Sequence, residues 1–163
     1  MHEREIIVLQ LEQAFRQVSW HGTNLIGSIR RLRPETAAWR PQGRRHNIWE
    51  LIVHAAYWKY SVYRRFAGGR TGSFPIKGSN WFKRPVDPSD TALRSDIELL
   101  KDLHSNLVDS VAKFDRGKFG DVPANSKTTF RDLAIGAAAH DLYHAGQIQM
   151  LKKLWKDSGT SRL

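Results

Sequence analysis

Four segments with helical periodicity, separated by helix-breaking residues, constrain this 163-residue chain most strongly. The first runs from about Glu3 to Leu32, with apolar residues through Val18 at three- and four-residue spacing, and ends before Pro34. Gly22 predicts a bend within it. The second begins at Asn47, a good N-cap with Glu50 placed as in a capping box, and ends at glycines 68 and 69.

The third segment runs from about Asp90 to Phe114, and the fourth opens at Thr129, with Asp132 placed to complete a capping box. No segment has the alternating pattern of a strand, and no internal repeat is visible. Four helices of about 20–30 residues each predict an all-α four-helix bundle that forms a single domain over residues 1–163.

The connection between the second and third segments is long and contains three prolines. At about 3.3 Å per residue it can return along the whole length of a helix. We therefore expect the second and third helices to run parallel, joined by an ordered crossover. Trp81 and Phe82 are expected to pin this crossover to the bundle.

The chain contains no cysteine, so any metal must be bound by histidine or carboxylate side chains. It has no apolar run long enough to span a bilayer, and its first residues lack the apolar core of a signal peptide. These features predict a soluble, cytoplasmic protein.

The formal net charge of +10 raises the question of an anionic partner. The basic residues are spread along the chain, apart from local groups at 30–33 and at Arg40, Arg44 and Arg45, and aromatic residues do not alternate with them. We expect a solvated basic surface and no nucleic-acid partner.

His140 and His144 are four residues apart and therefore share one face of the fourth helix, which is its apolar face. His54 lies on the apolar face of the second helix. Three imidazoles that face one core from two helices predict a site for a divalent metal, with positions left open for water or substrate. The alternative is a cluster of core histidines whose hydrogen bonds are satisfied by Gln147, Tyr143 and the backbone.

Other polar residues have open roles. Asp141 points about 100° away from His140 on the helix, so it orients a ligand from another helix, caps a local hydrogen-bond network, or is a surface or interface charge. Gln147 either hydrogen-bonds a metal-bound water or packs in the core. His21 lies at the predicted bend and either lines the mouth of the pocket or is structural. The remaining histidines, at positions 2, 46 and 104, are predicted to be surface or cap residues.

Two stretches resemble the DinB superfamily of metal-binding four-helix bundles (DinB/YfiT-like proteins): NIWELIVH at 47–54 and AHDLYHAGQI at 139–148. The resemblance covers nearly the whole chain. It implies a long crossover between helices two and three, and a homodimer. It also implies that His54, His140 and His144 bind a metal, usually zinc or nickel.

The resemblance further implies three kinds of activity. Some members resemble metal-dependent transferases that activate a low-molecular-weight thiol such as bacillithiol or mycothiol, and this is our leading prediction, with an arginine among Arg40, Arg44 and Arg45 binding an anionic group of the thiol. The alternatives are a metal-dependent hydrolase, with Asp141, His21 or Glu50 as general base, and a non-catalytic, stress-related metal-binding protein.

Overall fold

The computed structural model describes residues 2–69 and 71–159, and all regular structure in these ranges is helical, with no strand. It contains six α-helices and two short 3-10 turns, η1 (Pro41–Gly43) and η2 (Arg116–Lys118). The α-helices are α1 (Glu3–Phe15), α2 (Leu25–Ser28), α3 (Pro34–Ala38), α4 (Ile48–Phe66), α5 (Asp90–Ala112) and α6 (Phe130–Asp157). Within the described ranges, no helix is both long and apolar enough to cross a membrane.

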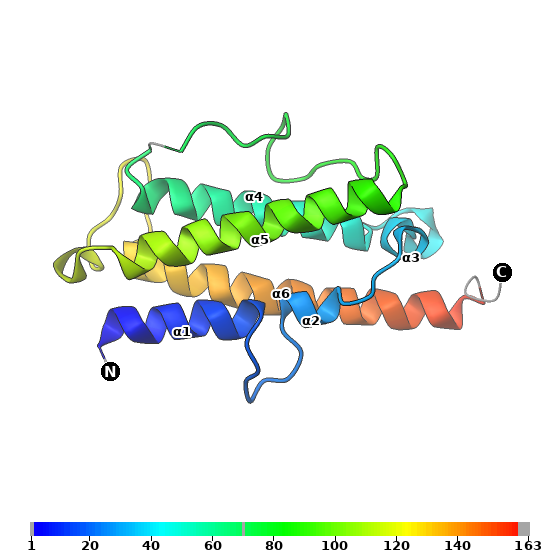
Figure 1. Cartoon of the computed structure of the whole chain (residues 1–163), viewed down its shortest axis with the longest axis horizontal. Helices are drawn as coiled ribbons and strands as arrows, with labels where there is room; N and C mark the ends of the chain where they lie inside the picture. Colours follow the sequence, from blue (N-terminus) through cyan, green and yellow to red (C-terminus); the bar gives the residue numbers. More distant parts are fainter. Residues whose placement is uncertain (1, 70, 160–163) are drawn as a thin grey trace.

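The four long helices lie side by side (Figure 1). Helix α4 packs against α5 and α6, and α1 packs against the same two helices. Helix α2 continues the line of α1 along α6 (Figure 1). Two groups of buried apolar residues fill the interior, one around Trp49, Leu100 and Ile148 and the other around Leu11 and Leu107. This packing holds α4 and α6 against each other, and these are the helices that carry the three predicted ligands.

The helix starts follow the predicted capping residues. Asn47 accepts a hydrogen bond from the Glu50 amide at 2.8 Å, and Thr129 accepts one from the Asp132 amide at 3.1 Å. The Glu50 carboxylate does not return to Asn47 as a capping box requires, because it bonds to Arg40 instead. The third predicted helix starts at the predicted residue and ends two residues early.

The first predicted helix is wrong over residues 16–24, which form a loop between α1 and α2, and over residues 29–32, which follow α2 and are not helical. Gly22 has a φ of +89°, which no helix accommodates. Asn24 caps α2 by accepting from the Gly27 amide, and its side-chain amide donates to the Gln17 carbonyl. These bonds replace the helical ones across the loop, and Val18, the last residue of the apolar spacing, is 96% exposed.

Residues 67–89 connect α4 to α5, and both helices run in the same direction in Figure 1. The segment is attached at several points. Phe82 is buried and contacts the rings of Tyr57 and Phe74. The Tyr60 hydroxyl donates to the Gly72 carbonyl at 2.7 Å. The prediction that Trp81 and Phe82 anchor this segment is confirmed. Trp81 packs on the ring of His54.

Candidate metal centre

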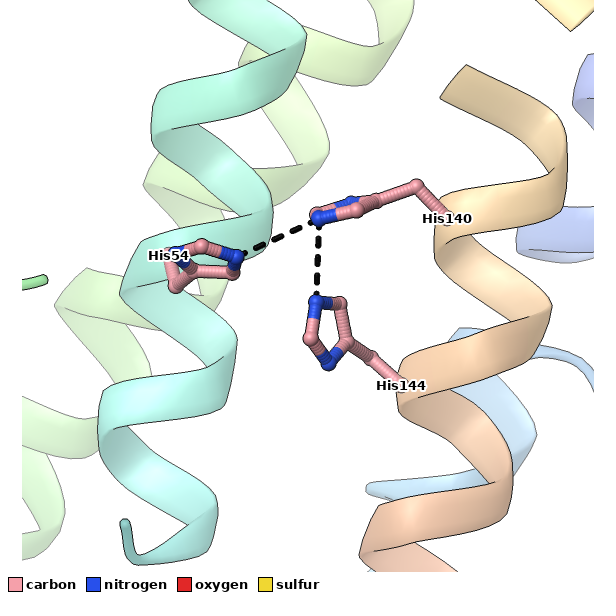
Figure 2. A group of neighbouring side chains, drawn as sticks. All are labelled: His54, His140 and His144. Carbon is pink, nitrogen blue, oxygen red and sulfur yellow. Dashed lines mark hydrogen bonds between the residues drawn. The ribbon is translucent and has the colours of Figure 1, made fainter. Parts of the chain in front are cut away.

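The fold brings the three predicted histidines together, His54 from α4 and His140 and His144 from α6 (Figure 2). The Nε2 atom of His140 lies 3.2 Å from that of His54 and 3.0 Å from that of His144. One ligand nitrogen from each ring lies within 4.8 Å of the other two. Ligands bound tetrahedrally at about 2.0–2.1 Å would be about 3.3 Å apart, so the cluster is close to the size of a zinc site.

Hydrogen bonds at the far side of two rings determine which nitrogen faces the centre. His54 Nδ1 lies 2.8 Å from the Asn80 carbonyl oxygen, and His144 Nδ1 lies 2.7 Å from Gln147 Oε1. Both partners accept, so both Nδ1 atoms carry the proton and both Nε2 atoms present lone pairs. A proton on His140 Nε2 can be donated to only one of these two lone pairs. The centre therefore has more lone pairs than protons, which is the electronic requirement of a cation site.

Burial keeps these rings neutral. It lowers the pKa of His140 to about 3 and that of His144 to about 4, and the neighbouring imidazoles lower the His140 pKa further. Burial also lowers the pKa of His54, against the opposing effect of its bond to Asn80. Neutral imidazole is the form that binds a metal, so the rings are in the ligand form at neutral pH.

The connection between α4 and α5 completes the site. Trp81 stacks on His54 with ring centroids 3.9 Å apart, and on its other face it stacks on His46 at 3.7 Å. Asn80, in a left-handed conformation with a φ of 62°, orients His54 through its carbonyl and accepts a hydrogen bond from Trp58 Nε1 through its side chain. Asn80 could not be identified from the sequence, because it acts through a backbone carbonyl, which every residue has.

A cavity of about 450 Å³ opens beside the three histidines. Its wall combines apolar side chains with a few polar ones: Arg45, His46, Leu51, Trp81, Tyr143, Gln147, Met150 and Leu151. A larger cavity of about 670 Å³ lies at the C-terminal end of α4, and none of the three histidines lines it. The smaller cavity is the one of these two that all three histidines line.

The predicted arginines separate into different environments. Arg40 Nη1 donates to Glu50 Oε2 at 2.9 Å, so this arginine is paired within the fold. Arg44 is exposed, whereas Arg45 lines the cavity beside the histidines. Glu50 is itself bonded to Arg40 and lies 2.9 Å from His46 Nδ1. Of the three arginines, Arg45 is the one that lines this cavity.

Of the roles predicted for Asp141, the structure shows a place in a local hydrogen-bond network, and not a surface charge. It is buried, and its Oδ2 accepts a hydrogen bond from Lys59 Nζ at 2.6 Å. Burial raises the pKa of Asp141 and lowers that of Lys59, and the attraction between the two opposes both shifts. The burial of Lys59 was not predicted, although its position on the apolar face of α4 could have indicated it.

The prediction that His104 is a surface or cap residue is wrong. It is fully buried, stacks on Phe15 at 3.7 Å, and accepts a hydrogen bond from Lys59 Nζ at 3.1 Å through Nδ1. Burial and the Lys59 charge lower its pKa to about 2, so its 3.4 Å approach to Glu12 is not an ion pair. Its spacing with Leu100 and Leu107 on α5 marked it as a core residue.

The other histidines lie apart from the centre or at its edge. His21 is exposed in the loop between α1 and α2 and does not line the cavity beside the three histidines. His2 caps α1, and His46 covers Trp81. His21 does not line the cavity, Glu50 is paired with Arg40 and Asp141 is paired with Lys59, so each predicted general base is unfavourably placed for hydrolysis.

Of three comparisons with known proteins, the one with family models found a match. Neither the curated proteins nor the solved structures contained a match to this chain. The family model of the DinB superfamily matches residues 17–148, a range that includes all three clustered histidines and most of the chain. The chain belongs to the DinB superfamily.

Proposed function

We propose that Nε2 of His54, His140 and His144 bind one divalent metal ion, with zinc or nickel as the best candidates. The observation that carries this proposal is the convergence of three neutral imidazoles whose lone pairs exceed the available protons. All-nitrogen imidazole sites suit both metals. The Asn80 carbonyl and Gln147 would orient two of the ligands, as partners in the outer shell of metal sites do.

We also infer that the fold is the four-helix bundle with a crossover that the family resemblance implied. Three observations support this inference: the side-by-side packing of α1, α4, α5 and α6, the shared direction of α4 and α5, and the attached segment 67–89 between them (Figure 1). In that arrangement, the crossover contributes to the site through residues 80 and 81.

Our proposed activity is transfer of a low-molecular-weight thiol to an electrophilic carbon. Three protein ligands leave a metal open on the cavity side, and a bound ion would supply a lowered pKa for a coordinated thiol. The overall reaction joins sulfur to carbon and releases a proton and the leaving group. Arg45 would bind an anionic group of the thiol, while Leu51 and Met150 would pack against its partner.

Metal binding is tested by analysing the metal content of the protein purified without a histidine tag. We expect near one ion per chain, and loss of most of it in His144→Ala, because two ligands cannot hold the ion as three do. The matched control is His21→Ala, which removes an exposed histidine outside the cluster. A folded protein that stays free of metal after incubation with zinc and with nickel would contradict the proposal.

The transferase proposal has its own test. The metal-loaded protein is assayed with bacillithiol, mycothiol and glutathione against a chromogenic electrophile, before and after removal of the metal by a chelator. We expect turnover only with metal, and a higher KM for the thiol in Arg45→Gln than in Arg44→Gln, which alters an exposed neighbour. Turnover that is unchanged after metal removal would show that the transferase proposal is wrong.

A further inference from the structure

The larger cavity, of about 670 Å³ at the C-terminal end of α4, has no role in the proposed function. Its walls are the C-terminal half of α4, residues 68 and 69 after it, and residues 123–125 with Phe130 before and at the start of α6. These segments lie at the same end of the bundle (Figure 1). Sites for small molecules measure about 300–1,000 Å³, so this cavity has room for a ligand.

Two arginines give this cavity a positive charge. Arg64 and Arg65 both line it, and no carboxylate of a described residue does. Neither arginine forms an ion pair in the part of the chain that the structure describes. Asp121, which precedes the opposite wall, is exposed and does not line the cavity. The C-terminal end of a helix carries about half a negative charge, so two guanidinium groups leave the site cationic.

The polar side chains in the wall are chiefly hydrogen-bond donors that the fold leaves available. Arg65 Nη1 donates to the Ser61 carbonyl oxygen at 2.7 Å and to its hydroxyl oxygen at 2.9 Å. Arg65 Nε is buried out of reach, whereas Nη2 is neither fully buried nor bonded to a described residue. The Tyr57 hydroxyl and the Asn125 amide also have no hydrogen-bond partner among the described residues. Such a set of donors suits a ligand group that only accepts.

Aromatic rings supply the apolar part of the wall. Tyr57 and Phe130 are half-buried and line the cavity, one from α4 and the other from α6. Tyr60 is buried beneath Arg64, whose guanidinium carbon lies 5.6 Å from the centre of the Tyr60 ring. Arg64 is itself exposed, so this contact leaves it accessible to an anion. The wall therefore offers ring surface beside cationic donors.

We propose that this cavity binds a small phosphate monoester that carries an aromatic ring. A phosphate monoester is close to dianionic at neutral pH, which matches two arginines, and its oxygens only accept. Guanidinium groups bind phosphate through paired N–H···O bonds. Arg64 and Arg65 Nη2 hold the phosphate, and the ring packs against Tyr57 and Phe130, because aromatic rings stack or meet edge to face. The site is separate from the three histidines.

The test uses three probes: phenyl phosphate, inorganic phosphate and benzyl alcohol, which keeps the ring without the charge. Each is titrated into the full ¹⁵N-labelled protein in a phosphate-free buffer, and amide shifts are followed by NMR. We expect saturable shifts at Gly68 and Ala124, with phenyl phosphate binding about tenfold more tightly than inorganic phosphate. Benzyl alcohol should not saturate. Equal affinity for the two phosphates would overturn the proposal, and so would shifts confined to Leu51 and Gln147 in the cavity beside the histidines.

Variants locate the site. Arg64→Gln and Arg65→Gln should each weaken phenyl phosphate binding at least about tenfold, because each loses a charged donor. The matched control is Arg94→Gln, which removes the same charge from an exposed arginine of α5 outside the cavity. If Arg65→Gln does not fold, Arg64→Gln answers the question, since its side chain is exposed. An equal loss in Arg94→Gln would show that only net charge matters and would overturn the proposal.

The metal content of each sample separates this inference from the proposed function. Phenyl phosphate binding that persists in His144→Ala after its metal is lost would support a site independent of the ion. Binding that disappears with the metal would place the phosphate at the histidine centre and overturn this proposal. A protein that binds phenyl phosphate at Gly68 and Ala124 but no metal would refute the metal proposal and leave this site intact.

Discussion

Lys59 and Asp141 place opposite charges in the interior, between α4 and α6. Removing two charges from water costs several kcal/mol per ion, and their attraction compensates only while both are present. Lys59 donates a second hydrogen bond to His104, so the buried network of polar side chains also reaches α5. At the scale of single residues, then, the interior depends on one pair whose members cannot be removed separately.

This dependence predicts the result of a double-mutant cycle. Lys59→Met should lower the free energy of unfolding by about 3–5 kcal/mol, because Asp141 is left buried and uncompensated. The double variant Lys59→Met/Asp141→Leu should recover more than half of that loss. Urea denaturation provides the measurement. Lys101→Met, at an exposed lysine paired with Glu98, is the control and should change stability by less than about 1 kcal/mol.

A loss of similar size from Lys59→Met and Lys101→Met would show that the buried pair is not energetically coupled to the fold. An additive double variant would lead to the same conclusion. In either case, water would have to reach Lys59 and Asp141 in solution.

Among the elements, the segment between α4 and α5 has a role beyond connecting them. It supplies the carbonyl that orients His54 and the indole that covers it, while α4 supplies the imidazole itself. A histidine ligand is held by its backbone on one side and by such contacts on the other. In the proposed metal site, this segment would therefore contribute to metal affinity without contributing a ligand.

We predict that Trp81→Ala weakens metal binding about 10–100-fold, which is the usual effect of losing an outer-shell contact. Trp81→Phe should retain most of the affinity, because a phenyl ring can still stack on His54. Competition with a chelator of known affinity measures both. Equal affinity in Trp81→Ala and the unmodified protein would show that the Asn80 carbonyl alone positions the ring.

For the whole molecule, the buried histidines determine the response to acid. The pKa values of His104, His140 and His144 are lowered to about 2, 3 and 4, chiefly by burial, from 6.5. The unfolded chain takes up these protons near pH 6.5 and the folded chain does not. Unfolding therefore binds protons below that pH, so stability is complete above about pH 6.5 and is lost as the pH falls.

The predicted slope is up to about 1.4 kcal/mol per pH unit for each histidine that stays neutral in the folded protein. Urea denaturation at pH 7.5, 6 and 5 measures it. His104→Gln should reduce the slope by about one histidine's share, since His140 and His144 still contribute. The exposed His21, changed to Gln as a control, should leave the slope as it is. A flat profile in the unmodified protein would contradict the lowered pKa values.

The homodimer implied by the family resemblance stays a prediction for the whole molecule. Trp20 and Val18 are fully exposed in the loop between α1 and α2, and apolar groups in such positions are suited to a contact with another chain. Light scattering decides between a monomer of 18.7 kDa and twice that mass.

The sequence by itself determined the local features of this protein. Helical periodicity predicted α4, α5 and α6 closely, and Asn47 and Thr129 marked two of their starts, because capping and amphipathic spacing are short-range properties. The spacing of His140 and His144 identified a shared helix face for the same reason. Together with the apolar position of His54, it was enough to predict which imidazoles meet.

The tertiary structure decided what lies opposite each face. The spacing of Lys59 and His104 on apolar helix faces could have indicated that both are buried, but their pairing with Asp141 and with each other depends on how α4, α5 and α6 pack together. The break at 16–24 was decided by the Asn24 side chain, which bonds to both sides of the loop. The orientation of His54 was decided by a carbonyl 26 residues away. Contacts between residues distant in sequence depend on the packing of whole elements, which local spacing does not encode.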